Sequence, residues 1–364
     1  MIEFEEFLAG LDHKEKRREL LFRDGRPYFV LISQQFKRDD LENLCDTATA
    51  IRRMDRRPDG PQFLKGTLAN YRIMHLFAQP STRTAESFVA AAEKLGATSR
   101  LVSDLQTSSF AKGETVDDSV RTLSSFFDCI VTRHPDDGFA RRASWALMRS
   151  GRPIPVVSAG SGKSQHVTQA LLDIYTLRYS FAERGGIDGK QVLIVGDVAR
   201  NRTARSLAYL LTKFDVPRIT FVSPENFSPD DDLMDYLVNR HSIDVRTIGD
   251  LGSALREHGS EIDAIYMTRA QREWDVAGSG EQAIGSSEAF VLKEEYKNLI
   301  RKNCVIMHPL PRVNELPHAW ENHPGFVVWR QVRNGMWIRA SLFATIFGAD
   351  EEIRARARRE GLLG

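Results

Sequence analysis

Residues 76–84 read Leu-Phe-Ala-Gln-Pro-Ser-Thr-Arg-Thr. The apolar start of this stretch predicts a buried strand that ends at Pro80, and an amphipathic helix follows with Phe88 among its inward-facing residues. The first turn of such a helix offers free N–H groups and the positive end of the helix dipole, which attract an anion. Arg83 adds a guanidinium whose donors match phosphate oxygens. The stretch therefore predicts an α/β unit with an anion site at the start of a helix.

Ser81 and Thr82 also fit a simpler interpretation, in which they are ordinary N-caps and Arg83 is a surface cation. Such caps are common, and for the Ser-Thr pair alone this interpretation is the better one. The arginine lies between hydroxyl residues, however, and directly follows a buried type of strand. This combination favours the anion site.

A second strand-to-helix turn of this kind lies at residues 192–203. Val-Leu-Ile-Val is typical of a strand, Gly196-Asp197 ends it, and Asn201-Arg202-Thr203 opens a helix. A single arginine turn of this kind can occur by chance. Two such turns in separate halves of the chain indicate an enzyme that binds two anionic substrates.

Length and composition exclude several classes of protein. The 364 residues favour about two domains, and a net charge of +1 does not favour nucleic acid or an anionic membrane as partner. The apolar runs are too short for membrane spans, and the acidic N-terminus lacks the pattern of a secretory signal. Cys45, Cys129 and Cys304 are widely spaced, which predicts reduced core thiols of a cytoplasmic protein. We expect no metal and no cofactor.

From about residue 73, apolar runs alternate with helical patterns, which predicts parallel sheets joined by right-handed crossovers. We expect an α/β fold of two domains, each a mostly parallel sheet flanked by helices. The first comprises 1–173, with a C-terminal helix 334–364 packing back on it and 1–28 as an extension, and the second comprises 174–333. The predicted strands are Ile73–Phe77, Ser99–Val102, Cys129–Arg133, Pro155–Val157, Val192–Val195, Ile219–Val222, Asp244–Thr247, Ala264–Met267, Val305–Met307 and Val327–Trp329.

Polar and cationic clusters follow several of these strands, where ligands of parallel sheets bind. The clusters lack a serine or cysteine nucleophile with a base and lack metal-ligand spacing. They therefore favour transfer of a group between two bound substrates, catalysed by positioning and by charge stabilisation. Taken singly, His166 is more often structural and His308 fits a rigid turn. The clusters are Arg133-His134-Pro135, Gln165-His166-Val167-Thr168-Gln169, Thr268-Arg269-Ala270-Gln271 and His308-Pro309-Leu310-Pro311-Arg312.

The order of these motifs resembles the aspartate/ornithine carbamoyltransferase family, from about Phe29 to Phe347. Within the family, the 268–271 and 308–311 segments are similar to those of the branch that uses aspartate rather than ornithine. The motifs that carry the resemblance are Pro80–Thr84, Thr107–Thr115, His166–Asp173, Gly196–Thr203, Tyr266–Gln271 and His308–Arg312.

The resemblance implies a site for carbamoyl phosphate. Arg133, His166 and Thr84 would bond the carbonyl oxygen and stabilise the negative charge that it gains when an amine attacks. Gln169 and the backbone carbonyl of Leu310 would hold the carbamoyl amide, with a cis Leu310–Pro311 bond shaping that turn. The phosphate itself would be held by Ser81, Thr82, Arg83 and Thr84.

The resemblance also implies the site of the second substrate. Arg202 and Arg269, helped by Gln271, would bind the two carboxylates of L-aspartate, and a dicarboxylate needs two guanidiniums. In the family, Ser108 and Lys112 reach into the active site of the neighbouring subunit. A homotrimer with shared sites is therefore implied, with a regulatory or dihydroorotase-type partner as a further possibility.

Four positions depart from the family pattern. Gln79 stands where a glutamate is usual, Ala85 where an arginine follows, and Val167 where a proline is usual. Trp274 stands where the aspartate enzymes often carry the arginine that pairs with that glutamate in the closed form. Because both members of the pair are absent, no charge is left stranded.

Two alternatives remain open at this point, and a third is set aside. Carbamoylation of another amino acid or amine is opposed by Arg269 with Gln271, since a cationic or neutral side chain does not need that arginine. A non-catalytic paralogue that serves as an assembly partner is opposed by the complete set of site residues. A nucleotide-binding dehydrogenase is opposed by Gly196-Asp197-Val198-Ala199, which lacks the glycine spacing for a pyrophosphate.

Overall fold

The structure, a computed structural model, describes residues 2–103, 113–162, 164–269 and 288–363. It divides into two compact units, Met1–Thr168 with Gly335–Gly364, and Gln169–Asn334. The chain passes from one unit to the other within two helices, which are α8 (Val167–Ser180) and α12 (Val328–Ile346).

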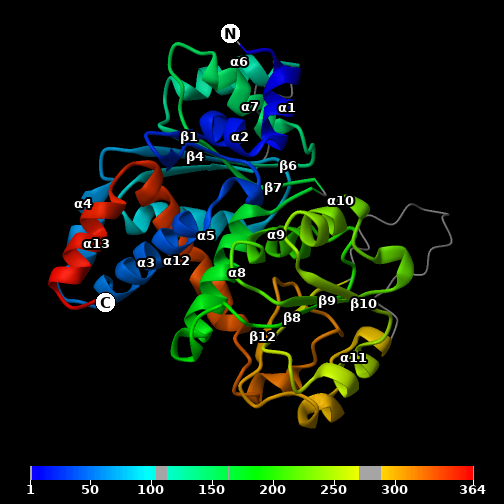
Figure 1. The fold of residues 1–364 in the computed structure, drawn as a ribbon. Helices are drawn as coiled ribbons and strands as arrows, with labels where there is room; N and C mark the ends of the chain where they lie inside the picture. Colours follow the sequence, from blue (N-terminus) through cyan, green and yellow to red (C-terminus); the bar gives the residue numbers. More distant parts are fainter. Residues whose placement is uncertain (1, 104–112, 163, 270–287, 364) are drawn as a thin grey trace. The chain divides into compact units, whose positions relative to one another are not determined.

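A parallel sheet forms the centre of the first unit (Figure 1), with five strands among the described residues. Both faces of β6 and β4 are buried almost throughout, as expected for apolar runs in a sheet covered on both sides. In sheet order the strands are β3 (Phe29–Val30), β7 (Val156–Ser161), β6 (Cys129–His134), β4 (Arg72–Phe77) and β5 (Thr98–Val102).

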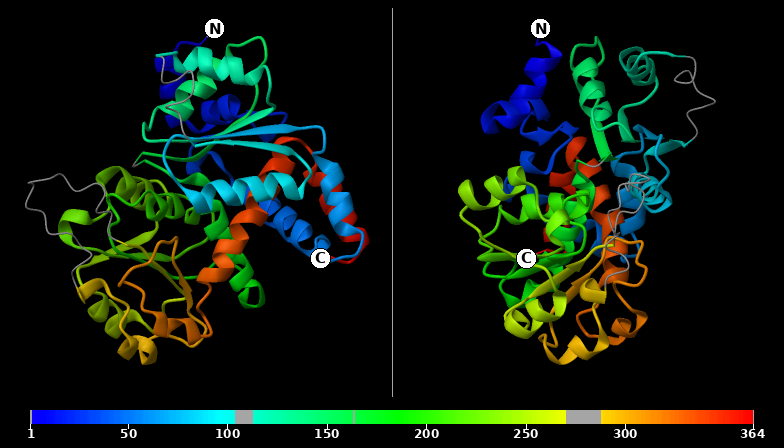
Figure 2. Two further views of the ribbon diagram at one scale, coloured as in Figure 1. Left: turned by 180° about the vertical axis from the view of Figure 1, so that it is seen from behind. Right: turned by 90° about the vertical axis from the view of Figure 1, so that its right-hand side faces the viewer.

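The helices of the first unit are α1 (Phe4–Asp12), α2 (Lys14–Leu21), α3 (Arg38–Met54), α4 (Gly60–Thr67), α5 (Thr82–Lys94), α6 (Val116–Ser124), α7 (Phe139–Met148) and α13 (Asp350–Arg359), with a 3₁₀ turn η1 (Ser33–Gln35). Figures 1 and 2 show α1, α2, α6 and α7 over one face of the sheet and α3, α5 and α13 over the other. The sheet is therefore covered on both sides.

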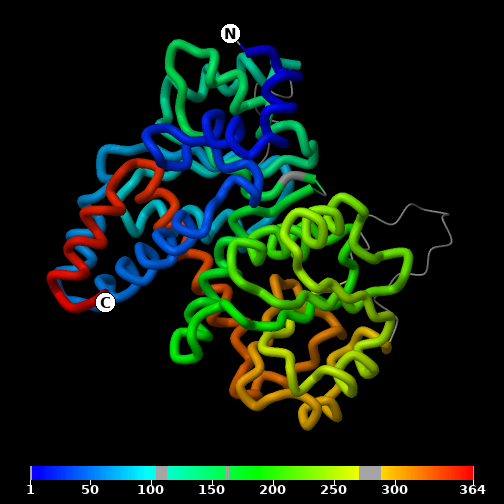
Figure 3. The backbone as a smooth tube through the Cα atoms, in the orientation of Figure 1, coloured from blue at the N-terminus to red at the C-terminus, as the bar shows by residue number. Residues whose placement is uncertain are grey.

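The two ends of the chain both belong to the first unit. The predicted helical extension 1–28 contains α1, α2 and a short antiparallel ribbon, β1 (Phe22–Arg23) and β2 (Arg26–Pro27). It packs on α7, where the Trp145 Nε1–H donates to the Ile2 carbonyl at 3.0 Å. At the other end, α13 lies beside α3 (Figure 3), and Arg354 donates to the Thr47 hydroxyl. The predicted single helix 334–364 is in fact the end of α12 followed by α13.

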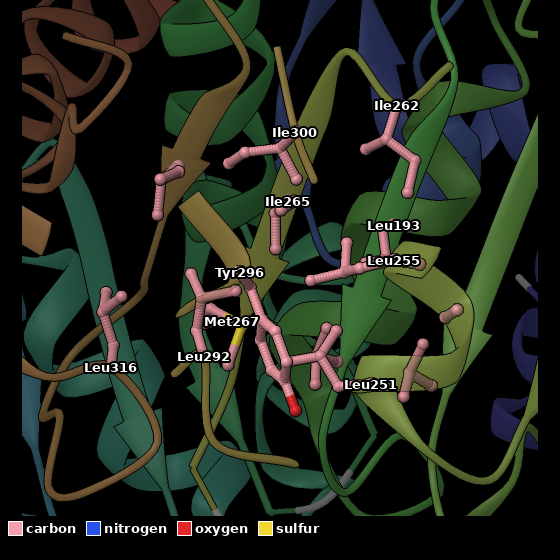
Figure 4. Packing of buried hydrophobic residues seen from close by; sticks show 14 of the residues in the cluster. Leu193, Leu251, Leu255, Ile262, Ile265, Met267, Leu292, Tyr296, Ile300 and Leu316 are labelled. Atoms are coloured by element: carbon pink, nitrogen blue, oxygen red, sulfur yellow. The ribbon is translucent and has the colours of Figure 1, made fainter. Parts of the chain in front are cut away.

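The second unit repeats the design with a parallel sheet, again of five strands in the part of the chain described. Its core contains Leu193, Ile265 and Met267 from the sheet, packed against Leu251 and Tyr296 (Figure 4). In sheet order the strands are β10 (Asp244–Ile248), β9 (Arg218–Val222), β8 (Val192–Val195), β11 (Ala264–Met267) and β12 (Val305–Met307). The helices are α9 (Arg202–Leu211), α10 (Asp231–Met234) with a π turn η5 (Asp235–Asn239), and α11 (Leu251–His258), with 3₁₀ turns η3 (Ala182–Arg184), η4 (Glu225–Phe227), η8 (Glu288–Phe290), η9 (Glu294–Asn298) and η10 (His318–Asn322).

The prediction of a strand at Val327–Trp329 is wrong. Phe326 forms an isolated bridge with Ile306, and the Val327 N–H donates to the Ile306 carbonyl at 3.0 Å. The chain then turns at once into α12, where the Trp329 side chain is 47% exposed. The apolar run resembled a buried strand, but its largest side chain faces solvent.

Each helix within the described ranges is too short or too polar to cross a membrane.

Candidate active site

The strand-to-helix turn of the first unit is fastened to the neighbouring strand. Phe77 at the end of β4 pairs with Arg133 in β6, and the Gln79 N–H donates to the Arg133 carbonyl at 3.2 Å. The carboxyl ends of two adjacent strands therefore bring the start of α5 and the side chain of Arg133 to the same edge of the sheet.

The first turn of α5 begins without a side-chain cap. Ser81 stands at the N-cap position, yet its hydroxyl accepts no N–H of the helix among the residues described here. The interpretation of Ser81 as an ordinary cap is therefore wrong. Thr82 and Arg83 are exposed, whereas Thr84 is buried. The first-turn N–H groups, hydroxyls and a guanidinium together at one helix start suit a phosphate group.

Gly160 in β7 lies between two of the predicted site residues. The pairing of β7 with β6 shifts register near its end, and Gly160 has φ +104°, a conformation that glycine adopts without strain. A Cβ atom at this position would lie 3.2 Å from Arg133 Nη1 and 3.2 Å from His166 Cδ2. The structure thus brings the buried side chains of Arg133 and His166 together around one glycine.

Two further contacts hold this pair in place. Arg133 Nη1 donates to the Ala159 carbonyl at 3.3 Å. Gln165, next to His166, accepts the Ser33 N–H at 2.7 Å and donates to Gln34 Oε1 at 2.8 Å. The start of α8 is therefore anchored to the segment that follows β3, and the position of His166 is defined by the fold.

In the second unit, Gly196 allows the ends of β8 and β11 to approach closely. Gly196 has φ +120°, and a Cβ atom there would lie 2.4 Å from Thr268 Oγ1. The Thr268 hydroxyl donates to the Val195 carbonyl at 2.7 Å. Arg202 and Arg269, both half-buried, follow the ends of these adjacent strands. Their placement suits the carboxylates of one substrate at this edge of the sheet.

The second arginine turn differs from the first in its helix start. Asn201 caps α9 with its side chain, because Oδ1 accepts the N–H groups of Thr203 and Ala204 at 3.0 and 3.4 Å. Two of the N–H groups in its first turn are therefore already engaged. An anion at this turn has Arg202 as its donor rather than the helix terminus, so the two turns are not equivalent anion sites.

His308 organises the turn that carries Leu310. Its Nδ1 accepts the Leu310 N–H at 2.8 Å, so the ring proton is on Nε2, which donates to Glu315 Oε1 at 2.8 Å. Burial lowers the pKa of His308, against the opposing effect of Glu315, and the Arg312 and Arg269 charges add to the lowering. The imidazole is therefore neutral near pH 7. The Leu310–Pro311 bond is cis, which confirms the sequence prediction, and Leu310 has φ +56°.

Gln169 is buried on α8, and its Nε2 donates to Asp173 Oδ1 at 3.0 Å. The four-residue spacing places both side chains on one face of the helix. Asp173 ends the His166–Asp173 motif but had no predicted role. A carboxylate in so apolar a helix was the sequence feature that could have revealed it. Gly160 was also missed, and a glycine near the end of an apolar strand was its signal.

Some predicted residues lie outside the described part of the chain, namely Ser108, Lys112, Gln271 and the departure at Trp274. In the described ranges, no cluster of three or more His, Cys, Asp or Glu side chains is suited to hold a metal ion. The candidate site residues in the described ranges are donors and cations: Arg133 with His166 in one unit, and Arg202 with Arg269 in the other. Such groups stabilise negative charge that develops on oxygen.

Two family models match the chain. The first, aspartate/ornithine carbamoyltransferase, carbamoyl-P binding domain, matches residues 30–179. The second, aspartate/ornithine carbamoyltransferase, Asp/Orn binding domain, matches residues 188–346.

Several relatives are similar over most of their length. Aspartate carbamoyltransferase 3, chloroplastic, of Pisum sativum is 39% identical over 316 residues, which are 86% of this chain and 76% of the relative. The aspartate carbamoyltransferase catalytic subunit of Cellvibrio japonicus is 35% identical over 343 residues, 90% of this chain and 95% of the relative. The solved structure of aspartate transcarbamoylase from Trypanosoma cruzi in complex with carbamoyl phosphate and aspartate matches with a TM-score of 0.77 at 29% identity, covering 87% of this chain and 96% of that one. The chain belongs to the aspartate/ornithine carbamoyltransferase family.

Proposed function

We propose that this protein transfers the carbamoyl group of carbamoyl phosphate to the amino group of L-aspartate. The products are N-carbamoyl-L-aspartate and phosphate, and the reaction belongs to pyrimidine biosynthesis. The observation that carries the proposal is the buried pair Arg133 and His166 around Gly160, in the same unit as the start of α5, where the Ser81 side chain does not cap the helix. The similarity to aspartate carbamoyltransferases over most of the chain supports the choice of substrates.

We assign carbamoyl phosphate to the first unit. Its phosphate binds at the start of α5, to Ser81, Thr82, Arg83 and Thr84. The amine of aspartate attacks the carbonyl carbon, and negative charge grows on the carbonyl oxygen. Arg133, His166 and Thr84 donate to that oxygen and stabilise the charge. The carbon–oxygen bond to phosphate then breaks, phosphate leaves with the bonding electron pair, and the attacking nitrogen gives up one proton to the departing phosphate.

We assign L-aspartate to the second unit. Arg202 and Arg269 bind the two carboxylates, and Gln271 assists. Gln169 and the Leu310 carbonyl, at the Leu310–Pro311 turn, hold the amino group of the carbamoyl moiety. The half-buried positions of the two arginines at the ends of β8 and β11 support this assignment, because partial burial strengthens a charge-assisted hydrogen bond.

We further propose a homotrimer in which Ser108 and Lys112 of one subunit complete the active site of its neighbour. A regulatory or dihydroorotase-type partner fits such an assembly as an additional component. Cys45, Cys129 and Cys304 are buried and not in disulfides, which supports a reducing, cytoplasmic setting.

A direct assay tests the function. Purified protein is supplied with carbamoyl phosphate and L-aspartate, and both carbamoyl-aspartate and phosphate are measured. We expect the two products in equal amounts. Release of phosphate without carbamoyl-aspartate, or turnover with L-ornithine or another amine in place of L-aspartate, contradicts the proposal.

A further inference from the structure

We propose that Asp173 is a positioning residue that orients both groups holding the carbamoyl amino group, the Gln169 amide and the Leu310 turn, and thereby selects a carbamoyl donor over an acyl donor. The inference rests on the proposed function. It concerns which phosphate compound donates its group, carbamoyl phosphate or acetyl phosphate. The proposed function, in contrast, is tested by the acceptor and the product.

Asp173 is a fully buried carboxylate on α8 that accepts hydrogen bonds from three side chains of the second unit. Its Oδ1 accepts from Gln169 Nε2 at 3.0 Å and from Gln331 Nε2 at 2.7 Å. Its Oδ2 accepts from the Tyr266 hydroxyl at 2.8 Å. Burial raises the pKa of Tyr266 well above its usual value, and the Asp173 charge adds to this, so Tyr266 keeps its proton and remains a donor.

The orientation of Gln331 is fixed independently of Asp173. Its Oε1 accepts the backbone N–H of His308 at 2.9 Å, and a backbone N–H can only donate. The amide nitrogen of Gln331 must therefore face Asp173, which makes Asp173 Oδ1 an acceptor. Gln169 must then also present its nitrogen to Oδ1.

This arrangement decides which end of Gln169 is offered to a substrate. With Nε2 held by Asp173, the Gln169 Oε1 is the end directed away from the carboxylate. An amide oxygen accepts a hydrogen bond from the amino group of a carbamoyl moiety, whereas the methyl group of an acetyl moiety has no proton to donate. A site built to bond an N–H group discriminates strongly against an analogue that lacks it.

The second branch of the network reaches Leu310. Gln331 holds the His308 backbone, and His308 Nδ1 accepts the Leu310 N–H at 2.8 Å. Leu310 has φ +56°, a conformation that is unfavourable for a non-glycine residue and persists where neighbours enforce it. Asp173 is thus linked through Gln331 and His308 to the turn that carries the second acceptor, the Leu310 carbonyl.

A purely structural role for Asp173 makes a different prediction. One turn further along α8, Thr176 accepts from Asn334 Nδ2 at 3.0 Å, also between α8 and α12 and also fully buried. Thr176 shares the helix and the burial of Asp173, but its hydroxyl bonds to Asn334 and to the Leu172 carbonyl. Thr176→Val is therefore a matched control for the loss of a buried hydrogen bond.

The experiment compares donors in the full-length protein. For wild type, Asp173→Leu, Asp173→Asn and Thr176→Val, kcat/KM is measured with carbamoyl phosphate and with acetyl phosphate, each with L-aspartate, and thermal unfolding is recorded in parallel. We expect Asp173→Leu to lower the ratio of carbamoyl to acetyl transfer by about tenfold or more, as the loss of one oriented hydrogen bond implies. Asp173→Asn keeps an acceptor oxygen and retains most of the selectivity, and Thr176→Val keeps wild-type selectivity even where its unfolding temperature falls.

Three outcomes would overturn the inference. These outcomes are a wild-type protein that does not prefer carbamoyl phosphate, equal losses with both donors in Asp173→Leu, or the same change of ratio in Thr176→Val. If Asp173→Leu does not fold, Asp173→Ala carries the same expectation, because the smaller side chain leaves room for water at the two amides. A wild-type protein that carbamoylates ornithine but not aspartate refutes the proposed function instead, and its donor ratio still tests Asp173.

Discussion

Replacement of Gly160 by alanine tests whether the fold around Arg133 and His166 serves catalysis. Gly160 has φ +104°, so an L-residue there is strained by about 1–2 kcal/mol. The new methyl group would also lie 3.2 Å from Arg133 Nη1 and from His166 Cδ2. The first effect acts on stability, and the second acts on the position of two proposed catalytic groups.

The size of the second effect follows from the contact distances. Ordinary contacts of a Cβ atom begin near 3.4 Å, so the neighbours of the new methyl must move by a few tenths of an ångström. Arg133 and His166 are both buried, which leaves them little freedom to move without losing their alignment. Since a misplacement of ~1 Å costs about a hundredfold in rate, we expect kcat to fall roughly three- to tenfold.

Gly185→Ala is the matched control. Gly185 has φ +81°, but no neighbouring atom of the described structure lies within 4 Å of its added Cβ. Both variants therefore carry backbone strain, and Gly160→Ala alone disturbs the candidate site. Steady-state kcat and thermal unfolding are measured for both. Equal kcat values in the two variants would refute the argument that Gly160 positions Arg133 and His166.

Four further changes have defined outcomes. Arg83→Ala is expected to abolish activity without lowering the unfolding temperature, because the side chain is exposed; a clear loss of stability assigns Arg83 a structural role instead. Arg269→Ala is expected to weaken aspartate binding by roughly 2–4 kcal/mol, through the loss of a charged hydrogen bond, and carbamoyl phosphate binding far less; calorimetry that finds equal losses contradicts the assignment. Burial lowers the pKa of His75 to about 4, so between pH 6.5 and 4 the unfolded chain binds a proton that the folded chain does not. In urea unfolding, the contribution of His75 to the free energy of unfolding should be complete above pH 6.5 and should be lost as the pH falls toward 4. The loss should be less steep in His75→Met, and identical pH profiles of the two proteins refute this. Inactive Lys112→Ala and Arg83→Ala proteins, dissociated and reassembled together, should regain part of the activity, and hybrid trimers without activity would show that each subunit carries its own complete site.

The alternation of strands and helices was predictable because buried parallel strands are apolar along their whole length, as in β4 and β6. The cis bond at Leu310–Pro311 followed from the family resemblance. The helical start at Val328 was not predictable from Val-Val-Trp, since the run has the composition of a strand and only tertiary contacts show Trp329 on the surface. Composition favours a local conformation, but it does not decide where the chain leaves a sheet.

The sequence allowed candidate site residues to be proposed singly, but not the hydrogen-bond network that connects them. The pattern indicated His308 and Gln169, but the partners that orient them, Glu315 and Asp173, come from hydrogen bonds that form only after folding. The same holds for the capping of α9 by Asn201, which makes the second arginine turn unlike the first. Sequence spacing predicted which arginines open the two helices. Only the structure shows which helix start is capped by a side chain.

The central claim is that this chain carbamoylates L-aspartate. The most direct test is a competition experiment followed by ¹³C NMR, in which purified protein receives [¹³C]carbamoyl phosphate with equal concentrations of L-aspartate, L-asparagine and L-ornithine. We predict that the label accumulates in N-carbamoyl-L-aspartate, because Arg202 and Arg269 provide two cations for two carboxylates. Label in the carbamoyl derivative of ornithine or asparagine, or label released only as bicarbonate, would contradict the account.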